Sequence, residues 1–251
     1  MRRYCLQRPN NFTIDSTHYL ARGLVFAGLA PGGMVGSTRY HDSSLYGNHG
    51  TLTNGPDWTF DPTLGRWCLS CDGNQDYIVI PKTPSIKAIS LWVNHVHSGG
   101  PSTYAYLFDA RLGGGTGYVY TTAYSPSNER IVPSSGTWYH DGVAGGYYAP
   151  NTWVNVVVNG ITTTISASGF PIGIKNDLSS DDYQGYIADF MAWDRSLSLS
   201  EISQLANPSN TLLSGLILPP RRMVFPAAVV SGGIDYKVYR KMNYYRKLRS
   251  F

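Results

Sequence analysis

The carboxylates are the first residues whose types and spacing could support catalysis. A retaining glycosidase needs two of them about 5–5.5 Å apart, flanking the bond that is cleaved. The chain has 16 acidic residues, but only two are glutamates, Glu129 and Glu201, and they are far apart in the sequence. Glu201 also completes a capping-box pattern with Ser198, and the adjacent Asp181 and Asp182 stand beside serines in a turn-like segment. We therefore expect a protein that is not an enzyme.

Aromatic residues offer a second chemistry, which is the binding of sugars. The glycine-rich segment 136–148 contains two neighbouring pairs of aromatic residues and resembles exposed loop. Aromatic rings present a flat apolar surface, and tyrosine and tryptophan add a polar edge. Packing within a strand and contact with another subunit are the alternatives. The candidate glycan-binding residues are Trp138, Tyr139, Tyr147 and Tyr148.

Histidines and cysteines show no spacing typical of a metal site or a nucleophile. His95 and His97 stand two residues apart in an apparent strand, and we expect them to form a pair at the surface. Cys68 and Cys71 stand three apart in another apparent strand, so their side chains should point to opposite faces. With Cys5 they make three cysteines, which cannot all pair. We expect reduced thiols that pack in the interior.

Short alternating segments bounded by turn residues predict strands through most of the chain. The strongest local pattern is 156–165, where Asn159-Gly160 between two β-branched runs predicts a hairpin with a type I′ turn. A short helix is predicted after Ser198. Many strands with almost no helix predict an all-β fold, a two-sheet antiparallel jelly-roll sandwich. The 42% of hydrophobic residues exclude a disordered chain, and no apolar run has the length of a membrane helix.

Charge is concentrated at the two ends of the chain. Residues 219–251 hold eight basic residues against Asp235 alone, although the formal net charge of the whole chain is only +4. This pattern predicts a basic N-terminal arm over 1–22, a jelly-roll domain over 23–210 and an extended basic C-terminal arm over 211–251. Because arginine and tyrosine are favoured anchors at protein interfaces, we expect the C-terminal arm to dock on protein. Binding to nucleic acid and a free tail are the alternatives. The candidate assembly contacts are Arg221, Arg222, Tyr236, Lys237, Tyr239, Arg240, Lys241, Tyr245, Arg246, Lys247 and Arg249.

Four segments in order, 23–26, 42–56, 69–78 and 185–202, resemble one known family. Together they resemble the laminin G-like modules of the concanavalin A-like lectin/glucanase superfamily. The resemblance implies a two-sheet jelly roll whose members bind glycans or protein ligands and often hold a structural calcium ion. The calcium ligands that it implies are Asp42, Asn48 and Asp189. The alternative is that the first two form a turn and that Asp189 is a solvated strand residue.

The segment 219–226 resembles the tails of laminin G-like proteins encoded by bacteriophages and prophages. Arg2 and Arg3 at the N-terminus are not followed by the apolar segment of a signal peptide. We therefore expect a non-catalytic virion protein, either a capsid decoration or a tail or fibre component, made in the host cytoplasm. Its basic arms would bind other virion proteins within a homo-oligomer or larger assembly, without membrane insertion, and its sandwich would bind glycans. A free carbohydrate-binding lectin is the alternative, and a glycoside hydrolase is the third.

Overall fold

The computed structural model describes residues 13–29, 37–96, 104–111, 116–125, 128–162, 169–178, 181–207 and 215–218. All of them belong to one compact unit that spans residues 1–220. The predicted assembly contacts between Arg221 and Arg249 lie outside the described residues, as do Cys5 and His97. No helix in the described part of the chain has the length and apolar character that crossing a bilayer requires.

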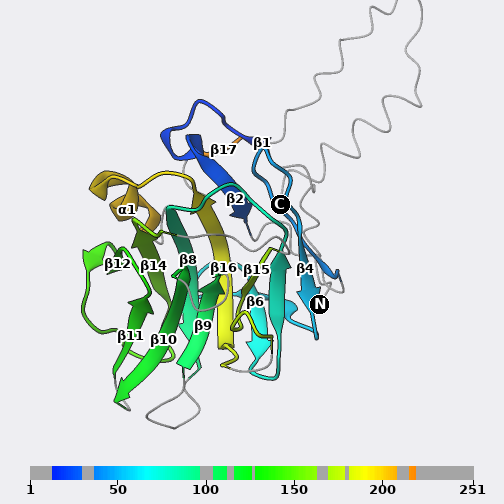
Figure 1. Ribbon diagram of the computed structural model, residues 1–251, viewed down its shortest axis with the longest axis vertical. Helices are drawn as coiled ribbons and strands as arrows, with labels where there is room; N and C mark the ends of the chain where they lie inside the picture. The colour runs from blue at the N-terminus through cyan, green and yellow to red at the C-terminus, as the bar shows by residue number, and fades with distance from the viewer. Residues whose placement is uncertain are drawn as a thin grey trace, which may run out of the picture. The chain divides into compact units, whose positions relative to one another are not determined.

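One layer of the fold is a large antiparallel sheet (Figure 1). The central strand of this sheet is β16 (Gln184–Trp193). One strand pairs with most of one edge of β16, and two further strands share its other edge. In order, the sheet contains β13 (Val143–Ala144), β12 (Thr137–His140), β14 (Val154–Asn159), β8 (Ala88–His95), β16 (Gln184–Trp193), β6 (Arg66–Asp72) and β5 (Asp57–Asp61), and β2 (Leu24–Gly28) also pairs with β16.

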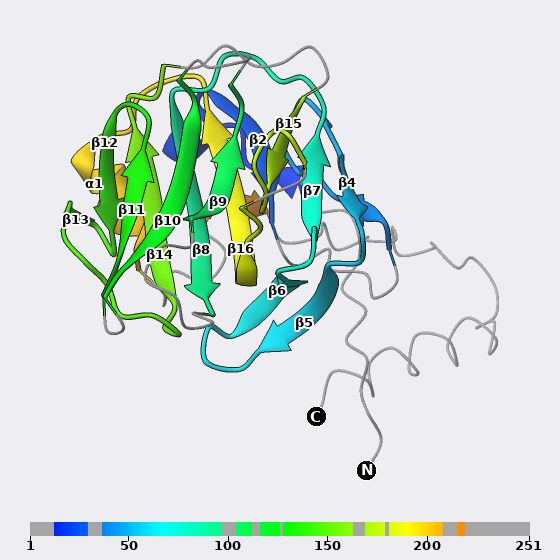
Figure 2. The same cartoon turned by 60° about the horizontal axis from the view of Figure 1, so that its bottom comes forward.

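The second layer consists of two smaller antiparallel sheets (Figure 2). They lie edge to edge, because β9 and β15 are neighbours without pairing. The two-layer, all-β sandwich that the sequence predicts is therefore confirmed. One sheet contains β11 (Asn128–Pro133), β10 (Tyr118–Ser125) and β9 (Tyr104–Asp109), and the other contains β15 (Phe170–Ile172), β7 (Tyr77–Ile80), β4 (Gly50–Thr53) and β3 (Arg39–Tyr40).

The space between the layers holds the main hydrophobic core. Alternate residues of each strand enter it, since successive side chains of a strand point to opposite faces. From β8 these are Ile89, Leu91 and Val93, and they join Val119 of β10 and Ile131 of β11 in one buried cluster. The residues between them face outward. This alternation decides which side chains of β9, β10 and β11 reach the surface.

A second cluster fills the opposite side of the large sheet, under α1 (Leu199–Leu205) and the N-terminal segment. That segment forms β1 (Thr13–Ile14), which pairs with β17 (Ile217–Leu218), and the 3-10 helix η1 (Tyr19–Ala21). Leu20 of η1 is fully buried. Strand pairing and burial thus place residues 13–22 and 217–218 in the same compact unit as residues 23–210, the range predicted for the jelly-roll domain.

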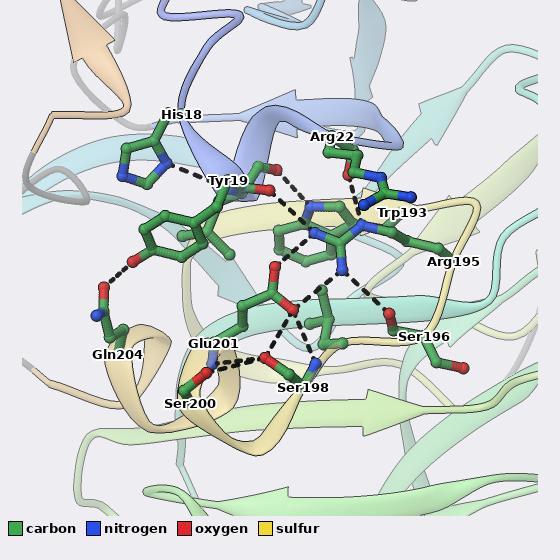
Figure 3. Close-up of polar contacts among 12 residues, drawn as sticks. His18, Tyr19, Arg22, Trp193, Arg195, Ser196, Ser198, Ser200, Glu201 and Gln204 are labelled. Carbon is green, nitrogen blue, oxygen red and sulfur yellow. Dashed lines mark hydrogen bonds and ion pairs between the residues drawn. The ribbon is translucent and has the colours of Figure 1, made fainter.

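Arg195 fastens this N-terminal segment to α1 (Figure 3). Its guanidinium donates hydrogen bonds to the carbonyl oxygens of Tyr19 (3.1 Å) and Arg22 (2.7 Å) and to both carboxylate oxygens of Glu201 (2.5 and 3.0 Å). Glu201 in turn accepts from the backbone of Ser198, and Ser198 accepts from the backbone of Glu201. The capping box predicted for these two residues is confirmed.

The hairpin predicted over 156–165 is wrong. Both edges of β14 are already taken, by β8 on one side and β12 on the other. Only Gly160 has a positive φ, whereas a type I′ turn needs two such residues. The side chain of Asn159 instead bonds the backbone of Leu197, at 2.8 and 2.9 Å. Asn159 is thus the last residue of β14, and the chain leaves the sheet at Gly160.

The two described cysteines are free and buried, and they lie on opposite faces of β6 as predicted. Cys71 packs in the main core, and Cys68 packs with Trp92 on the outer side of the large sheet. Burial raises the pKa of the Cys68 thiol to about 12. Both thiols therefore stay protonated and act as packing groups.

Candidate functional site

A surface hollow of about 340 Å³ opens between β11 and β12. β11 contributes its last four residues, 130–133, and the loop after β13 closes the hollow on a third side. The loop is tied to the strand because the amide of Gly145 donates to the carbonyl of Trp138 at 3.0 Å. Gly145 and Gly146 both have positive φ, which lets the backbone turn sharply at the rim. The hollow is lined by Arg130, Ile131, Val132, Pro133, Trp138, Gly145, Gly146 and Tyr147.

Two of the four predicted glycan-binding residues meet in this aromatic hollow. Trp138 is half-buried and packs against the main core, while Tyr147 is 46% exposed. They approach from different segments, Trp138 from β12 and Tyr147 from the loop after β13. Arg130 adds an exposed guanidinium. The combination of aromatic surface, hydrogen-bond donor and concave shape is typical of a small-molecule site.

The other two predicted residues do not reach the hollow. Tyr139 is next to Trp138 on β12, so it points to the opposite face and packs against the cluster under α1. Tyr148 is buried, with its hydroxyl 2.5 Å from the hydroxyl of Thr121. Burial, reinforced by the nearby Glu129, raises the pKa of Tyr148 well above its ordinary value. The prediction of an exposed pair at 147–148 is therefore wrong for Tyr148.

A group of tyrosines on the outward face of β9 and β10 was missed by sequence reasoning. We call Tyr104, Tyr106, Tyr118 and Tyr120 the tyrosine face. Ring centroids of neighbouring members lie 5.1–5.9 Å apart. The signal was present as two Tyr-x-Tyr patterns, which put both rings of each pair on one side of a strand. Pairing of β9 with β10 was needed to join the two patterns.

Arg111 holds one side of the tyrosine face in place. Its guanidinium lies 4.4 Å from the ring centroid of Tyr118 and 5.3 Å from that of Tyr106. Its orientation is fixed by the buried carboxylate of Asp109, which accepts hydrogen bonds of 2.8 and 3.0 Å. The charge of Arg111 is thus balanced by Asp109 within the protein. Its guanidinium packs against the rings of Tyr106 and Tyr118.

The tyrosine face and the aromatic hollow are continuous across β10 and β11. Tyr120 is directly opposite Val132 in the strand register, and Val132 lines the hollow. Burial and the neighbouring tyrosines raise the pKa of Tyr120, while the positive charge of nearby Arg130 opposes that rise. The hydroxyl of Tyr120 is therefore protonated at neutral pH and available as a donor and an acceptor.

Behind this surface, Glu129 sits in a polar network inside the core. Its side chain is fully buried, and its Oε1 lies 2.7 Å from Nδ1 of His95 on the facing layer. Its Oε2 accepts a hydrogen bond of 3.4 Å from Thr121, whose hydroxyl also contacts Tyr148. The expected surface position of His95 is wrong, because its strand alternation points it inward with Leu91 and Val93. Glu129 therefore bonds the two layers together, far from Glu201 at the capping box.

The two aspartates implied as calcium ligands bond within the protein through their carboxylates, and Asn48 bonds to one of them through its backbone. Asp42 is buried, and its two oxygens accept four hydrogen bonds of 2.7–2.9 Å from Ala27, Ser44 and the backbone of Asn48. Asp189 is buried at a β-bulge of β16, where its φ is 50° and its carboxylate pairs with Arg66 at 2.5 Å. Within the described residues, no three His, Cys, Asp or Glu side chains gather closely enough to hold a metal ion. Calcium binding stays a prediction.

Comparison with known proteins gives structural matches alone. No family model matches the chain, and no curated protein is similar to it, so the likeness to laminin G-like and phage proteins stays a prediction. Domain 4 of AbnA, a GH43 extracellular arabinanase from Geobacillus stearothermophilus, matches with 14% identity over 73% of this chain and 98% of its own, at a TM-score of 0.46.

Two other solved structures match at a similar level. Trypanosoma rangeli sialidase has 13% identity over 76% of this chain, with a TM-score of 0.47. The binding domain of Paraclostridial Mosquitocidal Protein 1 has 13% identity over 76% of this chain, with a TM-score of 0.42. The chain spans 33% of the sialidase and 53% of the mosquitocidal binding domain.

Proposed function

We propose that this protein is a non-catalytic β-sandwich module that binds glycans in the aromatic hollow. The observation that most supports this function is the meeting of Trp138 and Tyr147, from separate segments, around one concavity with Arg130. A sugar ring has apolar C–H faces and a rim of hydroxyl groups. The two aromatic side chains suit the faces, and the guanidinium and the tyrosine hydroxyl suit the rim.

We infer binding without bond cleavage from the positions of the carboxylates. A glycosidase needs a pair of acids at the sugar, and the two glutamates of the chain are engaged elsewhere: Glu129 inside the core and Glu201 with Arg195. The described lining of the hollow contains no carboxylate. We therefore expect binding without turnover.

A glycan microarray probed with the full chain tests the proposed function, followed by calorimetric titration with a free sugar identified on the array. Tyr147→Ala should weaken binding about tenfold, because an exposed aromatic ring that lines a binding site commonly carries that much affinity. Trp138→Phe should weaken it less, since an aromatic face remains. The matched control is Tyr46→Ala, which removes a tyrosine of similar exposure (54%) from the loop before β4.

Unchanged melting temperatures of the variants would show that the fold is intact. If no sugar on the array binds, or if Tyr147→Ala binds as the parent protein does, the proposed function is wrong. Release of shorter products from a bound oligosaccharide would contradict the non-catalytic part alone.

We also propose that the module belongs to a virion, with its basic C-terminal residues bound to other virion proteins. Support comes from the sequence, in which eight basic residues against Asp235 alone occupy 219–251. The chain should then be present in purified particles, and deletion of 219–251 should remove it from them while leaving sugar binding intact. Particles that retain the shortened chain would refute this role.

A further inference from the structure

The tyrosine face extends the aromatic hollow well beyond the size of one sugar. Paired strands are about 4.8 Å apart, so the face spans about 10 Å from β9 to β11 before the hollow begins. The rings differ in exposure along this path. Tyr104 is 49% exposed, Tyr118 and Tyr120 are partly exposed, and Tyr106 is buried.

The open rings are held in fixed positions. Tyr118 and Tyr120 stand on the same strand with planes 14° apart, and Tyr104 meets Tyr120 edge-on at 83°. Arg111 and Tyr106 support them from one side. A ligand that binds such a prearranged surface does not have to restrict these side chains further, and this increases affinity.

The polarity of the face indicates the chemistry of its occupant. The face presents aromatic rings and tyrosine hydroxyls, with Thr122 half-buried beside them, and the cation stacked on the rings, Arg111, is already paired with Asp109. Lys175, which interacts electrostatically with Tyr106, is likewise paired with Asp177. Such a surface complements a neutral molecule that alternates apolar faces with hydroxyl groups. Arg130 stands where the face meets the hollow, opposite Thr122 in the register.

We propose that the tyrosine face binds further sugar units of a glycan chain whose end occupies the aromatic hollow. The ligand class is therefore an extended, hydroxyl-rich polysaccharide or oligosaccharide. This inference rests on the proposed function, because the hollow must bind sugar for the chain to continue across the face.

Size-graded oligosaccharides of one to six units, prepared from cellulose, xylan, chitin and arabinan, test the inference by calorimetry with the full chain. For the series that binds, affinity should rise about tenfold or more from the shortest ligand to the longest. Tyr104→Ala and Tyr120→Ala should each weaken binding of the longest ligand about five- to tenfold and leave the shortest unchanged. Tyr147→Ala should weaken both.

Tyr46→Ala again serves as the control, and melting temperatures show that each variant folds. Affinity independent of chain length, or long-chain binding unaffected by Tyr104→Ala and Tyr120→Ala, would overturn the inference and leave the proposed function standing. If neither these series nor the microarray sugars bind at all, the proposed function itself fails. Length-dependent binding that disappears with the two tyrosine variants supports the inference.

Discussion

Removal of Glu129 gives the clearest quantitative test of how the two layers are joined. Glu129→Ala leaves Nδ1 of His95, 2.7 Å away in the parent protein, without this hydrogen-bond partner inside the core. Removing one partner of a buried hydrogen bond typically costs about 1–3 kcal/mol. For a chain of this size, 1 kcal/mol shifts the melting temperature by about 2–4 °C. The substitution should therefore lower the melting temperature by about 2–12 °C.

Two further variants separate the interaction from the loss of volume. Glu129→Gln keeps the shape and leaves a hydrogen-bonding group beside His95, so it should cost less than Glu129→Ala, only about 0.5–1.5 kcal/mol. In the double variant His95→Leu, Glu129→Leu, the Thr121 and Tyr148 hydroxyls still have each other as partners. Its cost should be smaller than the sum of the two single variants by about 1–3 kcal/mol.

Urea unfolding monitored by tryptophan fluorescence and by circular dichroism measures these free energies of unfolding. A loss below about 1 kcal/mol for Glu129→Ala would refute the reasoning, because removing a buried hydrogen-bond partner typically costs at least that much. Strict additivity of the two leucine substitutions would refute it as well. Agreement of the two probes is needed to treat the transition as two-state.

Two more predictions concern the carboxylates of Glu201, at the start of α1, and of Asp42, in the loop before β4. Against the opposing effect of burial, Arg195 and Ser198 hold the pKa of Glu201 below its ordinary value of 4.5, so its contribution to stability is full above pH 4.5 and is lost as the pH falls through the lower, folded pKa. Glu201→Gln should remove this part of the pH dependence in acid unfolding curves, and an unchanged curve would contradict the assignment. Asp42→Ala should lower the melting temperature equally in EDTA and in calcium, because its four hydrogen bonds need no metal. A loss seen only with calcium, together with stabilisation of the parent protein by calcium, would instead identify Asp42 as a ligand.

Local patterns predicted the elements of the fold well where a single segment carries the information. Strand alternation gave the opposite placement of Cys68 and Cys71, and the pairing of Ser198 with Glu201 gave the helix start. Both depend on contacts within a few residues. The same kind of evidence failed at Asn159-Gly160, because the two neighbours of β14 come from distant segments and exclude a hairpin partner.

Sequence reasoning found the two aromatic residues of the hollow, and these are half of the four residues that it predicted. It selected Trp138 and Tyr147 because a glycine-rich segment with aromatic residues is typical of a binding loop, and both line the hollow. It also selected Tyr148, which is buried in the core. Tyr148 follows Tyr147 in the chain and therefore points the other way, and its backbone forms a β-bridge with Glu129. It missed Tyr104 and Tyr120, since a tyrosine in a strand reads as a packing residue until the neighbouring strand is known.

The sequence by itself determined the all-β class, the scarcity of glutamates and the basic ends of the chain, because composition and short periodic patterns carry these properties. Tertiary structure decided which side chains meet. Register between β9, β10 and β11 joined the tyrosines to the hollow, and the packing of one layer on the other placed Glu129 against His95. The physical reason is that strand pairing and sheet packing join segments that are distant in the sequence. An alternating pattern shows that a strand has two faces, but the neighbouring strands and the facing sheet decide which face is buried.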